Sequence, residues 1–466
     1  MDVKKILKDP QAYNASLATP LAEQVYGELK ALQQQSQALA KKLKKMQADK
    51  GRLASLFKAA SANAVQLTAL KLQMHSISCT VRDTELAIAQ IRLATTRLLQ
   101  ESAAATKTQL PSRFTRTLAH YGKSIAWRWL DDPQDPLWQN FVQQQADLAS
   151  VYHLPVIHNT IQTAFGHRCK ILLALDSGTV VGGLPVTLFR NRLFGRQAVS
   201  VGFFNYGGPL TAYRDIAEQL IAQSRNLVTT DALDQIEIRT TLAGLPFPCV
   251  DEKVSMIRRL PERDAELETE LGAKVRAQVN KARAHKPAVR FGGAALLDDF
   301  YRVFAHNMRD LGTPVYSRVW FAQLLAAREL KASLVVCYLD AKPVSVGFLL
   351  GYQEVLEIPW ASTLRSVNGL NMNMWMYRQI LAHAIAEGYG FFDFGRSTQD
   401  ANTYRFKKQW GALPVAHYWY YPTTVGTASR SHDPDNPKLQ LLIKLWQKLP
   451  VWLTKIIGPP IIKNIP

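Results

Sequence analysis

The apolar residues near the start of the chain recur in alternating steps of four and three, the pattern of helices that pack along a common seam. The first series is Val25, Leu29, Leu32, Leu39, Leu43, Met46, Leu53 and Phe57. After a break of small residues around 58–64, the second series is Leu67, Leu70, Met74, Ile77, Val81, Ile88, Ile91 and Leu98. Two long helices with a short connection fold back on each other. We therefore expect an antiparallel α-helical coiled-coil hairpin over residues 1–110.

The polar faces of this hairpin are rich in Gln, Lys and Arg, and KKLKK at residues 41–45 forms a basic patch. In pattern and placement the hairpin resembles the tRNA-binding arm of seryl-tRNA synthetases, so tRNA is a candidate partner. A charge run on a helix is also the ordinary composition of a solvated face. The pattern leaves both interpretations open.

A second kind of pattern follows the hydrophilic stretch ESAAATKTQLPSR, which has the composition of a linker. CKILLALDSGTVVGGLPVTLF has the pattern of two strands joined at residues 176–178, and SLVVCYLDAKPVSVGFLLGYQ has that pattern again later in the chain. A strand, a helix and a strand follow in each half, so the order predicts a duplicated α+β unit. We expect a first domain at 111–265, a basic inter-domain helix at 266–290, a second domain at 291–430 and a basic amphipathic tail at 431–466.

Charge and cysteine content narrow the class of partner and site. The formal net charge of +19 favours polyanions such as RNA, nucleotide-linked substrates or an anionic membrane face. The cysteines are far apart, without a CxxC pair or a His at zinc-ligand spacing; they are Cys79, Cys169, Cys249 and Cys337. We therefore expect no metal site and no disulfide framework, and a reducing compartment.

The two ends of the sequence bear on location. MDVKKILKDPQAYNASL has no apolar signal region, and no apolar run is long enough to span a bilayer, which favours a cytoplasmic protein. The tail KLQLLIKLWQKLPVWLTKIIGPPIIKNIP alternates apolar residues with lysines and has no acid. Such a segment either lies in a membrane interface, on the inner face of the cytoplasmic membrane here, or packs back on the second domain as a terminal helix.

Several segments resemble, in the same order, FemAB-like proteins encoded with exosortase and exopolysaccharide systems. The second-domain segments are GTPVYSRVWFAQLL, GYGFFDFGRSTQDANTYRFKKQWG and DNPKLQLLIKLWQKLP, and the first-domain ones are TAFGHRCKILLAL, RNRLFGRQAVSVGFFNYGGPL and KVRAQVNKARAHK. The pair FDFGRS and FKxxWG is the most specific element. The resemblance implies an α+β fold of tandem GNAT-like domains, that is, a double acyl-CoA N-acyltransferase fold, and relatives that transfer amino acids from aminoacyl-tRNA to peptidoglycan precursors.

The resemblance also supplies candidate catalytic residues. Acyl transfer to an amine needs a group that stabilises the negative carbonyl oxygen and a base for the proton of the amine. Lys407 stands where FemX-type relatives place a lysine near the reacting carbonyl, although a surface lysine on a β-hairpin is the alternative. Asp393 and Arg396 follow the apolar strand FFDF, where Asp393 is a candidate base and Arg396 a bidentate ligand for carboxylate or phosphate. A structural ion pair between them is the alternative.

Further residues are candidates for substrate binding. In the first domain they form a turn whose glycines would leave backbone amides open to a ligand: Asn205, Tyr206, Gly207 and Gly208. In the second domain they are Asn307, Thr313, Tyr316, Trp360, Tyr404 and Phe406. His167 and Arg168 also recur in the family, and a structural role is their alternative. On the helix KVRAQVNKARAHK, one face carries Val275, Val279 and Ala282, and the basic face would bind phosphates or pack at the domain interface.

The identity of the acyl donor stays open at this point. Acetyl-CoA-dependent relatives hold the pyrophosphate with a glycine-rich run before a helix, and the corresponding stretch TLRSVNGLNMN has only Gly369. The donor is thus expected to be acyl-CoA or aminoacyl-tRNA, with no tightly bound cofactor. The predicted function is N-acyl or aminoacyl transfer to an amine of a nucleotide- or lipid-linked envelope precursor, of exopolysaccharide or peptidoglycan type. The alternative is a non-catalytic, membrane- or assembly-associated scaffold that retains the fold.

Overall fold

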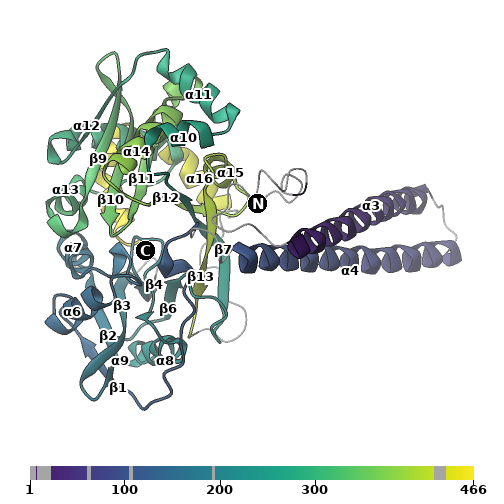
Figure 1. Ribbon diagram of the computed structural model, residues 1–466, viewed down its shortest axis with the longest axis horizontal. Coiled ribbons are helices and arrows are strands. Elements are labelled where there is room, and N and C mark those ends of the chain that lie inside the picture. Colours follow the sequence, from purple (N-terminus) through teal and green to yellow (C-terminus); the bar gives the residue numbers. More distant parts are fainter. Residues whose placement is uncertain (1–6, 8–22, 60–63, 104–108, 192–194, 424–436) are drawn as a thin grey trace. The chain divides into compact units, whose positions relative to one another are not determined.

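The computed structural model describes residues 7, 23–59, 64–103, 109–191, 195–423 and 437–466. By its contacts the chain divides into two compact units, Met1–Gln109 and Leu110–Pro466, and each is described by itself (Figure 1). The sequence before residue 23 apart from residue 7, the predicted connection at 60–63 and part of the predicted linker, 104–108, lie outside the described residues.

The first unit contains the two long helices that the heptad spacing predicts. They are α3, Glu23–Ala59, and α4, Ala64–Ala103, and they pack against each other. Leu29 of α3 and Ile88 of α4 are buried, and the described side chains at the other seam positions are partly buried. The lysines of 41–45 are exposed. The heptad positions thus form the contact face, while the hairpin connection and supercoiling stay predictions.

The second unit is an α+β structure with two similar halves. The first half contains α5 Ser112–Thr115, β1 Ala126–Leu130, α6 Pro136–Gln144, η1 Val151–His153, α7 Pro155–Phe165, β2 Arg168–Asp176, β3 Thr179–Asn191, β4 Gly195–Ser200, β5 Leu210–Thr211, α8 Arg214–Ser224, α9 Leu227–Thr230, β6 Gln235–Thr240 and β7 Cys249–Arg259. The second half contains α10 Asp264–Glu270, α11 Ala273–Arg283, β8 Ala288–Gly292, η2 Ala294–Leu296, α12 Leu297–Leu311, α13 Arg318–Ala326, η3 Arg328–Leu330, β9 Ser333–Leu339, β10 Lys342–Tyr352, β11 Val355–Thr363, η4 Arg365–Leu370, α14 Met372–Ala386, β12 Phe391–Thr398, α15 Asn402–Lys408, β13 Leu413–Tyr420, α16 Pro437–Trp446 and α17 Val451–Ile462.

The strands form one continuous sheet in which the same topology occurs twice. The order is β1-β2-β3-β4-β6-β13-β7-β12-β11-β10-β9-β8, with β5 beside β3. From either edge inward, three antiparallel pairs are followed by a parallel pair, β4 with β6 and β11 with β12, and then by an antiparallel pair. The predicted duplication is therefore present in the sheet.

The two halves exchange their last strands at the centre of this sheet. β7, which ends the first half, pairs with β12 of the second half. β13, from the end of the second half, pairs with β6 of the first half, and β7 and β13 also pair with each other. We call β1–β6 the first lobe of the sheet and β8–β12 the second lobe, each with the helices that its half contributes. The first lobe is completed by β13 and the second by β7, so the backbone hydrogen bonds of each lobe depend on both halves of the sequence.

The two predicted strand hairpins close with equivalent turns. Ser177 and Gly178 connect β2 to β3, and Asp340 and Ala341 connect β9 to β10. All four residues have positive φ angles between 49° and 86°. Two-residue loops of this conformation match the right-handed twist of antiparallel strands. The short polar sequences that predicted these turns therefore set the register of both hairpins.

Helices cover both faces of the sheet in the second lobe. Alternate residues of β9 and β10, such as Val336 and Phe348, pack with α12 and α13, whereas Val335 and Leu349 pack with α11 and α14. This alternation follows from the period of two in a strand. The predicted apolar face of α11, Val275 with Val279 and Ala282, is buried.

A shared apolar core joins the two lobes. Tyr152 and Phe204 of the first half lie in the same buried cluster as Trp320 and Phe348 of the second. Because cores pack closely, this cluster fixes the position of one lobe against the other. None of the described helices is both long and apolar enough to cross a bilayer.

Candidate functional site

The parallel strands of the second lobe pair over a short distance only. β11 and β12 are in register at Val355 with Phe391, Leu356 with Phe392, and Glu357 with Asp393. Beyond that point β11 continues beside β10 and β12 continues beside β7. Glu357 and Asp393 therefore mark the place where the two strands part.

These two residues form a buried pair of carboxyl groups. Their exposed fractions are 2% for Glu357 and 0% for Asp393. Neighbouring strands lie about 4.8 Å apart, so two aligned acids on them repel each other when both are charged. Burial, with the charge of Asp393, raises the pKa of Glu357 to about 8, although the Tyr152 hydroxyl donates a hydrogen bond to Glu357 Oε1. Burial raises the pKa of Asp393 as well. The pair can thus hold or accept a proton near neutral pH.

A β-bulge positions the backbone just after Asp393. The register of β12 against β7 shifts between Asp393 and Arg396, and Gly395 has a φ of 75°. The Gly395 amide donates to Asp393 Oδ1 at 2.8 Å. An added Cβ at Gly395 would lie 3.1 Å from the Ile358 carbonyl oxygen, so a side chain would be strained there. The glycine of the FDFGRS motif is therefore required by the backbone.

Lys407 lies on the short helix α15 and is buried, with an exposed fraction of 8%. This corrects the alternative of a surface lysine on a β-hairpin. Its Nζ donates to the carbonyl oxygens of Gly395 at 3.0 Å and Arg396 at 2.8 Å. An ammonium group has three donors, so one N–H is left by these two hydrogen bonds. Burial lowers the pKa of Lys407 to about 8, whereas the charges of Asp393 and Glu357 act in the opposite direction.

Arg396 extends the positive charge of the site towards solvent. Its side chain is exposed, and the positive charge of Arg239 lies close to it. The guanidinium groups of Arg239 and Arg396 lie 4.6 and 5.6 Å from the ring centre of Trp419. Arg239 is buried and paired with Glu237 at 2.7 Å. Arg396 forms no ion pair with any described carboxylate, Asp393 included, so the alternative of a structural ion pair between Asp393 and Arg396 is wrong.

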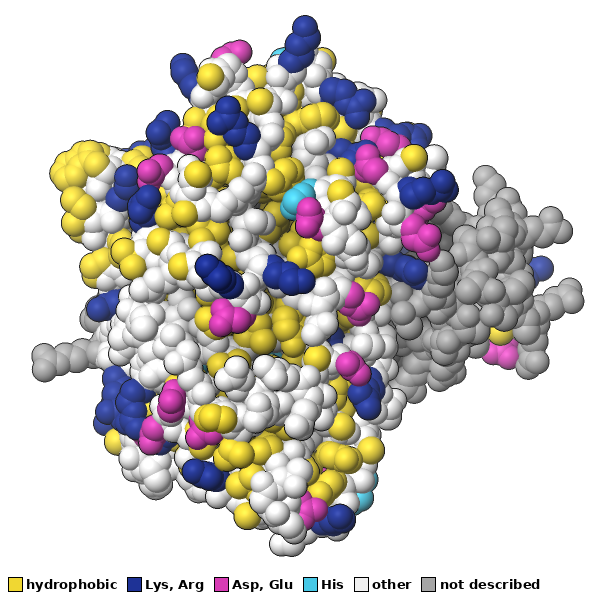
Figure 2. Space-filling model, turned by 60° about the vertical axis from the view of Figure 1, so that its left-hand side comes forward, with side chains coloured by type: hydrophobic (Ala, Val, Ile, Leu, Met, Phe, Trp, Pro, Cys, Tyr) yellow, Lys and Arg dark blue, Asp and Glu magenta, His cyan; other side chains and the backbone are white. Residues whose placement is uncertain are grey.

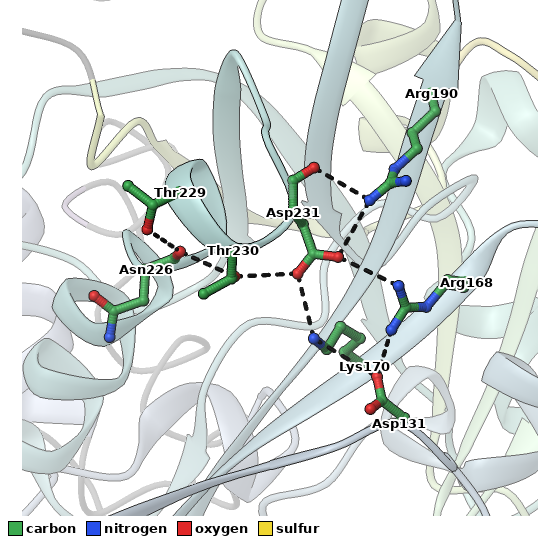
Figure 3. Close-up of polar contacts among 8 residues, drawn as sticks. All are labelled: Asp131, Arg168, Lys170, Arg190, Asn226, Thr229, Thr230 and Asp231. Atoms are coloured by element: carbon green, nitrogen blue, oxygen red, sulfur yellow. Dashed lines mark hydrogen bonds and ion pairs between the residues drawn. The ribbon is translucent and has the colours of Figure 1, made fainter.

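The basic residues of β2 and β3 in the first lobe, drawn in Figure 3, differ from Arg396 in their partners. There the side chains of Arg168, Lys170 and Arg190 converge on Asp231, at 3.4, 3.3 and 3.3 Å, and Asp131 pairs with Arg168 at 2.7 Å. These cations are paired with carboxylates and connect β2 and β3 to the residue after α9. Arg168 therefore has a structural role, whereas Arg396 has no carboxylate partner among the described residues and is available to a ligand.

In the predicted loop of the first lobe, the amide of Gly207 already has a partner within the protein. Gly207 N donates to the Arg239 carbonyl oxygen at 3.0 Å. Gly207 and Gly208 are buried, and an added Cβ at Gly208 would lie 2.7 Å from Thr240 Cβ. The expectation that both glycines leave open amides is thus wrong for Gly207, and close packing is what requires them. Asn205 is partly buried.

The side chain of Tyr206, in the same loop, lies beside Tyr152 and Arg113. Its ring lies 5.2 Å from Tyr152, and its hydroxyl accepts a hydrogen bond from Arg113 Nη2 at 3.5 Å. Burial raises the pKa of Tyr206. Arg113, Tyr206 and Gly207 also line a pocket of the first lobe together with His153. Tyr206 therefore lies between this pocket and the residue that contacts Glu357.

The predicted binding residues of the second lobe divide into three groups. Tyr316 lies near Arg396, and its ring is 5.8 Å from Trp360, so both form an aromatic wall close to the site. Asn307 Nδ2 donates to Ser362 Oγ at 3.0 Å, and the Thr313 amide donates to the Met308 carbonyl oxygen at the end of α12. Both residues therefore have partners within the protein. Tyr404 and Phe406 pack in the core beside α14.

Four residues of the site were not predicted from the sequence: Arg113, Tyr152, Arg239 and Glu357. Glu357 carried a signal, because an acid within the apolar strand VLEIPWAS repeats the acid of FFDFG. Arg239 also carried a sequence signal, since EIR on β6 matches DFGR on β12 without the bulge glycine. Tyr152 and Arg113 reach the site through tertiary packing alone.

The predicted phosphate-binding face of α11 is largely occupied. Arg276 donates to the Leu271 carbonyl at 2.9 Å, and Arg283 pairs with Glu268 at 3.6 Å. On the face shown in Figure 2, Lys and Arg side chains are scattered among acidic and hydrophobic ones rather than gathered in one track. The packing alternative for this helix is therefore favoured over a nucleic-acid track.

One further contact and the cysteine and metal-ligand content bear on the predicted residues and sites. His167 Nε2 lies 2.5 Å from the Lys463 carbonyl oxygen, so it connects to the tail of the chain. Among the residues that the structure describes, no group of three or more His, Cys, Asp or Glu is placed to hold a metal ion. The described thiols Cys169, Cys249 and Cys337 are free.

Comparison with known proteins identifies the fold of the lobe that carries this site. A family model described as "Acetyltransferase (GNAT) domain" matches residues 272–408, which include Glu357, Asp393 and Lys407. The matched lobe is GNAT-like, and the first lobe repeats the strand pairing of its sheet. The GNAT match supports an acyltransferase activity. GNAT domains use acyl-CoA as donor. No curated protein matches the sequence.

Several solved structures are distantly similar. FemX is 12% identical with a TM-score of 0.45, over 57% of this chain and 91% of that chain. L-PGS from Bacillus licheniformis is 12% identical with a TM-score of 0.43, over 68% of this chain and 99% of that one. A tandem GNAT protein from the clavulanic acid biosynthesis pathway is 11% identical with a TM-score of 0.43, over 65% and 100%.

Proposed function

We propose that this protein transfers an acyl or aminoacyl group to an amine of a cell-envelope precursor, of exopolysaccharide or peptidoglycan type. The observation that carries the proposal is the buried carboxyl pair of Glu357 and Asp393 next to Lys407, at the point where β11 and β12 part. Buried ionisable groups destabilise a fold, so they are usually kept where they serve a function. Their presence favours an enzyme over the alternative of a scaffold without turnover.

In the proposed reaction, the carboxyl pair and Lys407 each have one role. A neutral amine attacks the carbonyl carbon of a thioester or ester, a C–N bond forms, and the proton of the amine passes to the carboxyl pair. The free N–H of Lys407 donates to the carbonyl oxygen as that oxygen becomes negative. The C–S or C–O bond then breaks, and the leaving thiolate or alkoxide takes up a proton.

Arg396 supplies the anchor for the substrate. A guanidinium without a protein counterion binds phosphate or carboxylate in a bidentate manner. Nucleotide- and lipid-linked precursors carry phosphates, as do acyl-CoA and aminoacyl-tRNA. The FemAB-like resemblance of the FDFGRS and FKxxWG segments supports an envelope acceptor, and the cytoplasmic side of the membrane is the proposed location.

The segment that would hold a CoA pyrophosphate is not glycine-rich. It forms the 3₁₀ helix η4, which carries the single Gly369, and α14 begins at Met372. Acyl-CoA and aminoacyl-tRNA are therefore both proposed donors. The test incubates the full chain with radiolabelled acyl-CoA or aminoacyl-tRNA and with UDP-amino sugars or peptide precursors. Transfer that is lost in Lys407→Met and kept in Lys408→Met supports the proposal, and absence of transfer from either donor, with no ligand-induced thermal shift, overturns it.

A further inference from the structure

The exposed large hydrophobic side chains of the second unit gather in one region. Among its described residues there are seven: Leu311, Val319, Leu442, Leu445, Trp452, Ile456 and Ile461. Two lie at the end of α12 and the start of α13, and the other five lie on α16 and α17. We name this set the apolar patch. Single exposed hydrophobic residues are ordinary, but a concentration of them marks an interaction surface.

The elements that carry the apolar patch are in direct contact. An added Cβ at Gly312, after α12, would lie 2.5 Å from Ile443 of α16. Arg309 Nη1 donates to the Leu449 carbonyl oxygen at 3.0 Å. An added Cβ at Gly458 of α17 would lie 2.9 Å from Val315 N. The tail therefore packs on the α12–α13 segment with one side and leaves its other side to solvent.

The solvent side of α17 combines apolar and basic residues. Trp452, Lys455 and Ile456 are spaced at i, i+3 and i+4, so they share one face, and all three are exposed. The exposed fractions of Trp452 and Ile456 are 64% and 63%, too high for a packed helix face. The sequence from 437 to 466 has lysines and no acid. This composition is that of an interfacial helix rather than of a spanning one.

A basic pocket opens beside this face. Its lining includes Tyr301, Arg302, Ser317, Arg318 and Lys455. Arg318 pairs with Asp298 at 2.7 Å and Arg302 with Asp299 at 3.5 Å, whereas Lys455 lies over the ring of Tyr301 at 5.5 Å. Three cations and two acids leave a net positive charge, which suits a phosphate group. The Tyr301 hydroxyl donates to the Tyr316 carbonyl oxygen, whereas the Ser317 hydroxyl only accepts, from Trp320 N, and keeps its O–H for a ligand.

We propose that the apolar patch rests on the surface of an anionic lipid bilayer, with a lipid phosphate in the pocket beside Lys455. Charge decides between this occupant and a second copy of the chain. Two copies that met through the patch would bring the exposed Lys444, Lys448 and Lys455 of each against those of the other. An anionic bilayer neutralises the lysines while Trp452 and Ile456 enter the interface. This inference does not depend on turnover at the site.

The test is sedimentation of the full chain with vesicles of phosphatidylcholine alone or mixed with phosphatidylglycerol. We expect binding to the mixed vesicles at least ~10-fold stronger than to the neutral ones, weakening as salt is raised. Trp452→Ser with Ile456→Ser should reduce binding at least ~10-fold. Leu72→Ser, which changes a 68% exposed leucine of the first unit, is the matched control and should have no effect.

The charged part is tested by Lys455→Glu against Lys342→Glu, an exposed lysine on β10. Lys455→Glu should weaken binding to the mixed vesicles, and Lys342→Glu should not. Free glycerol phosphate should compete only at concentrations far above that of vesicle lipid. Equal binding by wild type and by the Trp452/Ile456 double variant, with unchanged melting, overturns the proposal. A dimer in light scattering that the double variant dissociates overturns it as well, since the patch is then an interface between copies.

Discussion

Glu357 and Asp393 are the last residue pair across the parallel strands β11 and β12, and both carboxyl groups are buried. Two acids at this spacing cannot both be charged without a large cost, so one of them holds a proton near neutral pH. Lys407 supplies positive charge nearby, and its own pKa is lowered to about 8. The site thus has a proton acceptor and a donor whose ionisation falls in the same pH range.

Lys407→Met should lower kcat at least ~100-fold, because the carbonyl oxygen loses its donor. The melting temperature should also fall, since the carbonyls of Gly395 and Arg396 lose their hydrogen bonds. Lys408→Met, at the adjacent exposed position, is the matched control and should change neither. Equal kcat values for the two variants would remove Lys407 from the mechanism.

The pH profile of kcat/KM should be bell-shaped, with both limbs near pH 8. The acidic limb arises because the carboxyl pair must lose a proton, and the basic limb because Lys407 must keep one. Glu357→Gln removes one negative charge that lies near both Asp393 and Lys407, so the pKa values of these two groups should fall. Both limbs should therefore move to lower pH, and a profile that stays in place contradicts the shared pair.

Stability should depend on pH through Glu357. Folding raises the pKa of this carboxyl from its ordinary value of 4.5 to about 8. The stabilisation is therefore complete below about pH 4.5 and is lost as the pH rises through 8, and within this window the free energy of unfolding falls by up to about 1.4 kcal/mol for each pH unit. Glu357→Gln does not titrate, so its melting temperature relative to wild type should rise between pH 5 and pH 9. The exposed Glu354→Gln should show no such trend.

Gly395→Ala should destabilise the protein by about 1–3 kcal/mol, because φ is positive and the new Cβ would press on the Ile358 carbonyl. Gly369→Ala is the comparison, since nothing lies within 4 Å of its added Cβ. Denaturant unfolding of both variants measures the difference. A change of similar size at the two positions would show that the bulge is not strained.

The exchanged strands β7 and β13 predict that the halves of the second unit do not fold alone. Residues 109–262, expressed without 263–466, lack β13 beside β6, and the second fragment lacks β7 beside β12. Each fragment should be aggregated or without near-UV circular dichroism, whereas co-expression should give a complex that purifies together. A monomeric fragment with cooperative unfolding would show that the exchange is dispensable.

Local pattern was sufficient for much of this fold. The heptads at 25–98 identified α3 and α4, because helix contacts follow a short period. Polar turn residues identified the β2–β3 and β9–β10 hairpins, since such turns tolerate positive φ. FDFGRS and FKxxWG led to Asp393, Arg396 and Lys407, whose side chains or backbone do meet at β12.

What only the tertiary structure decided is which distant segments are neighbours. Period-two strands specify faces but not partners, so the exchange of β7 and β13 left no local signal. Gly207 and Gly208 suggested open amides, yet their need for glycine comes from close packing, at Gly208 against Arg239 and Thr240. Glu357 became half of a proton-holding pair only because β11 lies beside β12, since a pKa is set by burial and by neighbouring charges that sequence order does not reveal.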